Sequence, residues 1–175
     1  MSTLKVNALQ NTSGNTLTFI KQVKQTVKQD TFSETVDRNE ETGSCGLDVT
    51  ITPSSTSSKM LILVQACIGF ITDDNVGYVI RRGSTTISDY MPTGAGNRMT
   101  SASGGVTRNN AYLANVNGNF LDSPATTSAV TYSVRLKYGR ADDNRTLYLN
   151  RGEDDDNAAS RMRSTSVITV MEVAG

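Results

Sequence analysis

The sequence of 175 residues contains no histidine and no tryptophan. Without histidine it has no Ser-His-Asp or Cys-His pair, no imidazole zinc site and no histidine general base. Its 17 basic and 17 acidic residues give a formal net charge of zero. A neutral balance argues against a nucleic-acid binder, because such proteins carry a basic surface. These absences predict a protein that is not an enzyme, holds no metal or cofactor and binds no nucleic acid.

Long apolar runs and cysteines are also scarce. No apolar run reaches the roughly 18 residues that a membrane-spanning helix needs, so we expect no membrane insertion. The N-terminus has no basic start followed by an apolar core, which indicates synthesis in a cytoplasm rather than secretion. In that reducing compartment Cys45 and Cys67 are most simply free thiols, with a disulfide between them as the alternative.

Serine, threonine and asparagine are abundant instead, and apolar residues between them recur with a period of two, which predicts strands. The run over residues 58–71 is apolar on both faces. It predicts a central strand that is buried on both sides at least over its first half. Further alternating segments predict shorter strands at Leu47–Thr52, Val76–Arg82, Thr85–Ile87, Asn119–Leu121, Val130–Tyr138, Leu147–Leu149 and Thr165–Val173.

These segments predict an all-β fold. Leu47–Thr52 and the strand after Lys59 are expected to join by a hairpin or by a longer connection. Phe19–Gln29 fits a helix stripe or a strand face, and its lysines favour an edge strand. The total of about nine or ten strands predicts an antiparallel β-sandwich of jelly-roll type.

The chain divides into two parts. Residues 1–20 form a short segment in which Leu4, Val6 and Ala8 alternate with polar residues, and this segment is too small to bury a core of its own. Residues 21–175 form one continuous β domain. A terminal strand of this kind needs a sheet to join, in its own domain or in a partner.

Charged clusters offer weak evidence of a binding site. The run Glu153–Asp156, with Asp142 and Asp143 on a neighbouring loop, predicts either a calcium site or a solvated acidic turn, and the spacing favours the turn. Arg81–Arg82 and Arg161–Arg163 are expected to pair with the many aspartates across strands.

Surface chemistry gives two further hypotheses. Paired carboxylates can hydrolyse glycosides, but each candidate aspartate falls in an exposed-looking turn, which argues against glycan cleavage. Tyrosines can instead contact a sugar, because each offers an apolar body and a polar tip. Tyr132 and Tyr138 lie on the apolar face of a strand and are expected in the core. Tyr90 and Tyr112 lie beside loops and are the candidates for surface contact.

Several strings resemble segments of small tail-fibre-like or virion structural proteins of marine tailed bacteriophages, of the cyanophage type. The resemblance covers about residues 26–175 in order. The strings that carry it are Asp48–Lys59 with Met60–Val64, Arg82–Thr86, Gly118–Tyr132, Leu147–Arg151 and Ser166–Val173. The start, Leu4–Gly14, resembles a separate module that opens many phage fibres and adhesins before quite different C-terminal domains.

The resemblance implies a protein of the virion surface, made in the host cytoplasm. It implies a homotrimer that docks on other virion proteins (capsid, tail or fibre base) through Leu4, Val6, Ala8 and Leu9, and that contacts a host surface glycan with its β domain. A capsid decoration protein without a receptor role is the alternative, and a glycan-cleaving depolymerase a more distant one. Many fibres place a long shaft between docking segment and tip, whereas only a few residues separate them here, which favours a compact knob.

Overall fold

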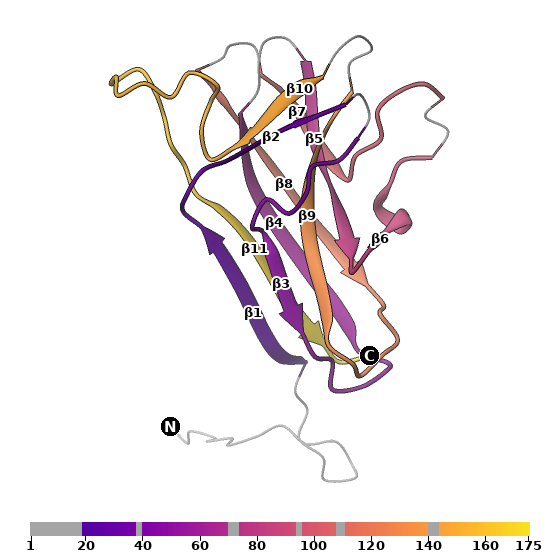
Figure 1. The fold of residues 1–175 in the computed structure, drawn as a ribbon. Coiled ribbons are helices and arrows are strands. Elements are labelled where there is room, and N and C mark those ends of the chain that lie inside the picture. Colours follow the sequence, from indigo (N-terminus) through magenta and orange to yellow (C-terminus); the bar gives the residue numbers. More distant parts are fainter. Residues whose placement is uncertain (1–18, 38–39, 70–73, 94–95, 108–110, 140–143) are drawn as a thin grey trace, which may run out of the picture.

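The computed structural model describes residues 19–37, 40–69, 74–93, 96–107, 111–139 and 144–175 (Figure 1). These residues form an all-β fold with a single one-turn 3-10 helix, η1 (Ser88–Tyr90). The strands of the described part are β1 (Ile20–Lys28), β2 (Phe32–Val36), β3 (Asp48–Ile51), β4 (Lys59–Gly69), β5 (Asp74–Arg82), β6 (Thr85–Thr86), β7 (Ser103–Thr107), β8 (Leu113–Asp122), β9 (Val130–Tyr138), β10 (Arg145–Leu149) and β11 (Ser166–Val173).

The strands pair into two antiparallel sheets. The six-stranded sheet has the order β1-β11-β4-β10-β2, with β8 also paired to β4, and the five-stranded sheet has the order β3-β9-β5-β6, with β7 also paired to β5. On one side of β4, β11 pairs with Lys59–Gln65 and β10 pairs further along with Ile68 and Gly69. The six-stranded sheet is therefore about four strands wide at any level.

Side chains from both sheets form one core between them. The period of two that predicts the strands also selects these residues, because alternate side chains of each strand point inward. The largest fully buried side chains are Tyr78, Tyr132, Tyr138, Leu47, Ile51, Met60, Ile62, Ile68, Ile80, Leu136 and Leu147. The expectation that Tyr132 and Tyr138 belong to the core is confirmed.

Most of the strands expected from the sequence are present. Phe19–Gln29 forms the strand β1, which pairs with β11 at the edge of its sheet, as expected. Residues 82–85 form the expected turn between β5 and β6, where Gly83 has a φ of 60°, a conformation that glycine adopts readily. The described residues contain eleven strands rather than nine or ten, because β2 and β7 lie in segments where no strand was expected.

The connection between β3 and β4 is not a hairpin. β3 pairs with β9 in the five-stranded sheet, whereas β4 is the centre of the other sheet. The Ser/Thr-rich segment of residues 52–58 therefore crosses from one sheet to the other, and the longer of the two expected connections is the one observed.

The expected burial of β4 is wrong in one respect. Its first half is buried only on the inner face, by Met60, Ile62 and Val64, while Leu61 and Leu63 on the outer face stay partly exposed. The second half, residues 66–69, is buried on both faces. The cause is local, because the segment after β10 covers this half: Ser164 Oγ lies 3.2 Å from Cys67 Sγ, and Asn150 N donates to the Cys67 carbonyl.

Cys45 and Cys67 are free thiols, as expected, and both are buried. Burial raises the pKa of Cys45 to about 11, so its reactive thiolate is disfavoured. Within the described residues, no helix has the length and apolar character needed to cross a membrane.

A close backbone approach at Gly69 yields a prediction about stability. A Cβ at this position would overlap the carbonyl oxygen of Arg151, and backbone atoms move less readily than side chains. We expect Gly69→Ala to lower the free energy of unfolding by about 1–3 kcal/mol, the usual range for overpacking. The control is Gly105→Ala in β7, where the added Cβ would meet side chains at 3.6 Å, an ordinary contact. Urea unfolding of both variants measures the difference, and equal stability would contradict it.

Candidate functional site

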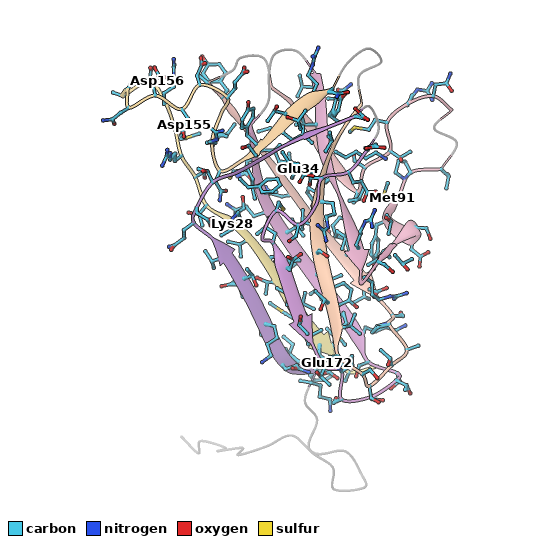
Figure 2. The ribbon with its side chains drawn as sticks, in the orientation of Figure 1. Lys28, Glu34, Met91, Asp155, Asp156 and Glu172 are labelled. Atoms are coloured by element: carbon cyan, nitrogen blue, oxygen red, sulfur yellow. The ribbon has the colours of Figure 1, made fainter. Side chains whose placement is uncertain are left out.

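The sandwich has two different ends. β1 begins at one end, where the chain also terminates, and the long loop between β10 and β11 lies at the opposite end (Figure 1). Figure 2 shows Glu172 at the first end, and Asp155 and Asp156 in the loop at the other. We call these the terminal end and the loop end.

The expected docking residues Leu4, Val6, Ala8 and Leu9 lie outside the described residues. The structure does describe where the chain leaves this segment. Ile20 pairs with Val173, and the Ala174 amide donates to the Phe19 carbonyl at 2.9 Å. The described chain therefore begins at the terminal end, with Phe19 and Ile20 beside the last strand.

A buried carboxylate organises the terminal end. Glu172 of β11 is fully buried, and its side chain follows Ile168 and Val170 on the inner face of the strand. Its Oε1 accepts hydrogen bonds from Ser54 N at 2.7 Å, Ser54 Oγ at 2.5 Å and Ser58 Oγ at 2.6 Å. Its Oε2 accepts from Gln22 Nε2 at 2.7 Å, and the same amide donates to the Thr52 carbonyl. Glu172 thereby holds β1, β11 and the β3–β4 crossing together.

These donors also decide the charge of Glu172. Burial by itself would raise the pKa of the carboxyl, but the hydrogen bonds from Ser54, Ser58 and Gln22 outweigh it and hold the pKa at about 2. The group is therefore a carboxylate at neutral pH, stabilised by hydroxyl and amide donors in a site where the described residues include no ion-pair partner for it.

A second buried carboxylate ties the two sheets together. Asp122, at the end of β8, accepts from Arg82 Nη1 of β5 at 2.8 Å and from Tyr132 OH of β9 at 2.6 Å. The expectation that the candidate aspartates lie in exposed turns is wrong for Asp122, because it is 5% exposed. A shallow recess of about 160 Å³ lies over this group, lined by Arg82, Asp122, Ser123, Asp89 and residues 85–88. With its carboxylate already bonded to Arg82 and Tyr132, the group serves as a structural tie.

The loop end is anchored by Asn150, which follows β10 with a φ of 65°. Its Nδ2 donates to the carbonyls of Lys28 and Asp30, at 2.8 and 2.9 Å, and its Oδ1 accepts from Ser166 Oγ at 2.6 Å. This fully buried amide fixes the β1–β2 turn against β11. Asn150 directly follows the strand expected at Leu147–Leu149.

The acidic run in the loop is neutralised by arginines. Arg163 makes two hydrogen bonds to Asp155, at 2.9 and 2.7 Å, and Arg151 lies 3.5 Å from the same carboxylate. Arg161 pairs with Asp156 at 3.0 Å and with Asp154 at 3.5 Å. Arg163 and Arg161 are the main causes that lower the pKa of Asp155 and Asp156 respectively.

Arg161 and Arg163 therefore partner aspartates as expected, but within one loop rather than across strands. Arg82 pairs with Asp122, while Arg81 instead pairs with Glu41 at 2.7 Å. In the described part of the chain, no group of three or more potential ligands could hold a metal ion. Asp142 and Asp143, the expected neighbours of the acidic run, lie outside the described residues.

The two tyrosines expected to contact a ligand lie far apart. Tyr90 in η1 packs on Phe120 of β8, with ring centroids 4.7 Å apart, and is partly buried. Burial, with the nearby carboxylates of Asp122 and Asp89, raises its pKa to about 12. Tyr112 precedes Leu113 at the other end of β8 and is 61% exposed. Tyr112 lies eight residues before Phe120, which is about 27 Å of extended chain, so Tyr90 and Tyr112 do not form one surface.

Sequence reasoning missed the buried carboxylates although one signal pointed to Glu172. The period of two through Ile168 and Val170 places residue 172 on the same inner face, and an acidic residue there requires buried partners. For Asp122, the adjacent Ser123-Pro124 suggests a turn, so the sequence does not indicate that the strand continues to this residue.

A comparison with known protein families and with curated proteins finds no match to this sequence.

The Glu172 site yields a prediction about acid stability. Because the folded pKa of about 2 lies below the ordinary value of 4.5, the site stabilises the fold fully above about pH 4.5, and this contribution is lost as the pH falls towards 2. We expect Glu172→Gln to lower the free energy of unfolding at pH 7 by about 3 kcal/mol, since one amide oxygen cannot replace two carboxylate oxygens among four donors. The variant should also lose less stability than the parent between pH 5 and pH 2.

The matched control is Glu34→Gln. Among the described residues, Glu34 accepts one hydrogen bond, from the Gly43 amide at 2.9 Å, and an amide oxygen can still accept it. We expect a change below about 1 kcal/mol, the usual worth of one such bond. Urea unfolding from pH 2 to pH 7 measures both variants, and a Glu172→Gln protein as stable as the parent at pH 7 would refute the assignment.

Proposed function

We propose that this protein is a structural protein of the surface of a tailed-bacteriophage virion, of the fibre or knob type. It docks on the particle through residues 1–20 and projects the β domain, residues 21–175, for attachment to a host surface or for decoration. The observation that carries the proposal is the placement of the start of β1 at one end of the sandwich and the long loop at the other (Figure 1). A domain held at its terminal end presents its loop end outward.

The finer architecture belongs to the same proposal. We assign the sandwich to the jelly-roll type, because the chain passes repeatedly between sheets, at β2–β3, β3–β4, β4–β5, β7–β8, β8–β9 and β9–β10. Such crossings are typical of Greek-key sandwiches. The protein acts as a homotrimer bound to capsid, tail or fibre-base proteins, with a host glycan as the ligand of the domain.

The same proposal makes the protein a non-enzyme. The two most buried carboxylates, Glu172 and Asp122, are already bonded to Ser, Gln, Arg and Tyr side chains, and Asp155 is bonded to Arg163. Carboxylates held in this way serve structure, whereas glycoside hydrolysis needs an acid and a base that face a substrate.

A decoration protein without a receptor role is the second candidate, and one observation favours it. Of the two tyrosines considered for ligand contact, Tyr90 is packed on Phe120, which leaves only Tyr112 widely exposed at the loop end. A single aromatic is a small platform for a sugar ring, because sugar recognition draws on apolar and polar contact together.

Removal of the docking segment tests the virion role. We expect a protein lacking residues 1–15 to fold, since the first described strand begins at Ile20, but to be absent from particles assembled in its presence. Mass spectrometry of purified virions measures incorporation, with the full chain as the control, and circular dichroism measures folding. Full incorporation of the truncated protein would refute the docking role, and absence of the full chain from virions would refute the virion role itself.

Substitution of Tyr112 separates attachment from decoration. If the loop end binds a host glycan, Tyr112→Ala should slow adsorption of phage to cells several-fold, because exposed aromatics contribute strongly to binding. Its 61% exposure predicts an unfolding free energy within about 0.5 kcal/mol of the parent. Adsorption rates of particles carrying either protein measure the effect. Unchanged adsorption with normal incorporation would favour the decoration role.

A further inference from the structure

Among the described residues, no segment covers the outer face of the six-stranded sheet along the first half of β4. Three rows of side chains run across β1, β11, β4 and β8 on this side. The rows are Val23–Met171–Leu61–Leu121, Gln25–Thr169–Leu63–Asn119 and Val27–Val167–Gln65–Asn117. We call these side chains the open face.

The open face is apolar at one end and neutral throughout. Its first row is entirely apolar, and Val23 and Leu121 in that row are 51% and 54% exposed. Val27, in the third row, is 48% exposed. The rows contain no charged side chain, although 19% of the chain is charged. A hollow of about 470 Å³ lies among the second and third rows, lined by Gln25, Leu63, Gln65, Asn117, Val167 and Thr169 with Val64 beneath. An exposed apolar row beside a hollow is a surface that a partner covers.

The sequence of β4 also predicts that its outer face is covered. Its alternate residues are apolar on both sides, a pattern of strands that are buried on both faces. The single chain covers the second half of β4 with the segment after β10, but leaves Leu61 and Leu63 in the first half partly exposed. The unsatisfied part of the pattern coincides with the open face.

We propose that a second copy of this chain covers the open face. Association of identical copies brings identical charges together in many arrangements, so a face without charge suits it, whereas interfaces between unlike proteins commonly use complementary charges. The amides of Gln25, Gln65, Asn117 and Asn119 support the same partner. Each amide both donates and accepts hydrogen bonds, so such groups can pair with their own kind.

The size of the face sets the scale of this contact. The three rows span about 20 Å along the strands at about 3.4 Å per residue, and four strands about 4.8 Å apart give about 400 Å². A stable interface buries about 800 Å² per partner, so the three rows make up about half of one and the side chains around them supply the rest. Copies related by an axis along the strands keep all their terminal ends together, as docking on one base requires. The inference specifies the contact within the proposed homotrimer and does not depend on the virion role.

Charge placed on the open face tests the inference. We expect the full chain to sediment with a mass that is a multiple of 18.8 kDa at micromolar concentration. The pair Val23→Glu and Leu121→Glu should raise the dissociation constant at least tenfold. The matched control is Val106→Glu in β7 of the other sheet, because Val106 and Leu121 are both 54% exposed, and it should leave the mass unchanged.

A second variant guards against misfolding. Gln65→Lys adds charge at an exposed polar position in the middle of the face, so it removes no apolar contact, and it should also weaken association. A monomeric full chain at about 100 µM would overturn the proposal, as would equal effects of Val106→Glu and the face variants. A monomer destabilised by Leu121→Glu but not by Val106→Glu would mean that residues 1–18 of the same chain cover the face, which also overturns it.

The result is separable from the virion role. A dimeric or trimeric wild type that the face variants dissociate supports the inference even if virions lack the protein. An assembly that persists in the face variants overturns it even if virions contain the protein.

Discussion

The buried carboxylate of Glu172 is the interaction on which the terminal half of the sandwich depends. It accepts hydrogen bonds from Gln22 in β1 and from Ser54 and Ser58 in the crossing between the sheets. An unpaired charge in this position would be strongly destabilising, so the four donors must all be in place at once. Folding of the crossing and attachment of β1 are therefore coupled. The edge strand, which is polar and weakly packed, keeps its place because the carboxylate holds it, and the position of the N-terminal segment follows from that placement.

The covering of β4 explains why the two halves of the molecule differ. A strand that is apolar on both sides needs a second layer on each. At the loop end, the chain supplies this layer with the segment after β10, which Asn150 and its contacts to Lys28, Asp30 and Ser166 hold in place. At the terminal end, the described residues supply none. At the loop end, Asp154, Asp155 and Asp156 are paired with arginines, whereas the three rows of the open face carry no charge. This difference is the basis of the proposed association at the open face.

Much of the fold follows from the period of two in the sequence. Val130–Tyr138 and Thr165–Val173 alternate so cleanly that their strands agree with the structure within a residue. Strand β7 was not predicted because Ser103-Gly104-Gly105 has small or no side chains, so its sequence shows no period of two. Strand β2 was not predicted because Phe32–Val36 is short and mixes Phe, Glu and Val. The assignment of β3 and β4 to different sheets depends on partners far along the chain, which local pattern does not encode. Of the sites, the arginine–aspartate pairs were predictable from charge, whereas the contacts of Glu172 and Asp122 required the sheet register.

The abundance of Ser, Thr and Asn has two physical consequences rather than one. Their hydroxyls and amides supply the donors that keep a buried carboxylate charged without a cation, as Ser54 and Ser58 do for Glu172. Exposed on a strand, the same kinds of group give a surface that is polar but neutral, as Asn117 and Asn119 do beside the apolar row. Such a surface stays hydrated in a single chain, yet its groups can pair with identical groups when copies meet, without the repulsion that like charges would cause. In the proposed contact between copies, the same side chains keep the surface polar in the single chain and recognise an identical surface in the assembly.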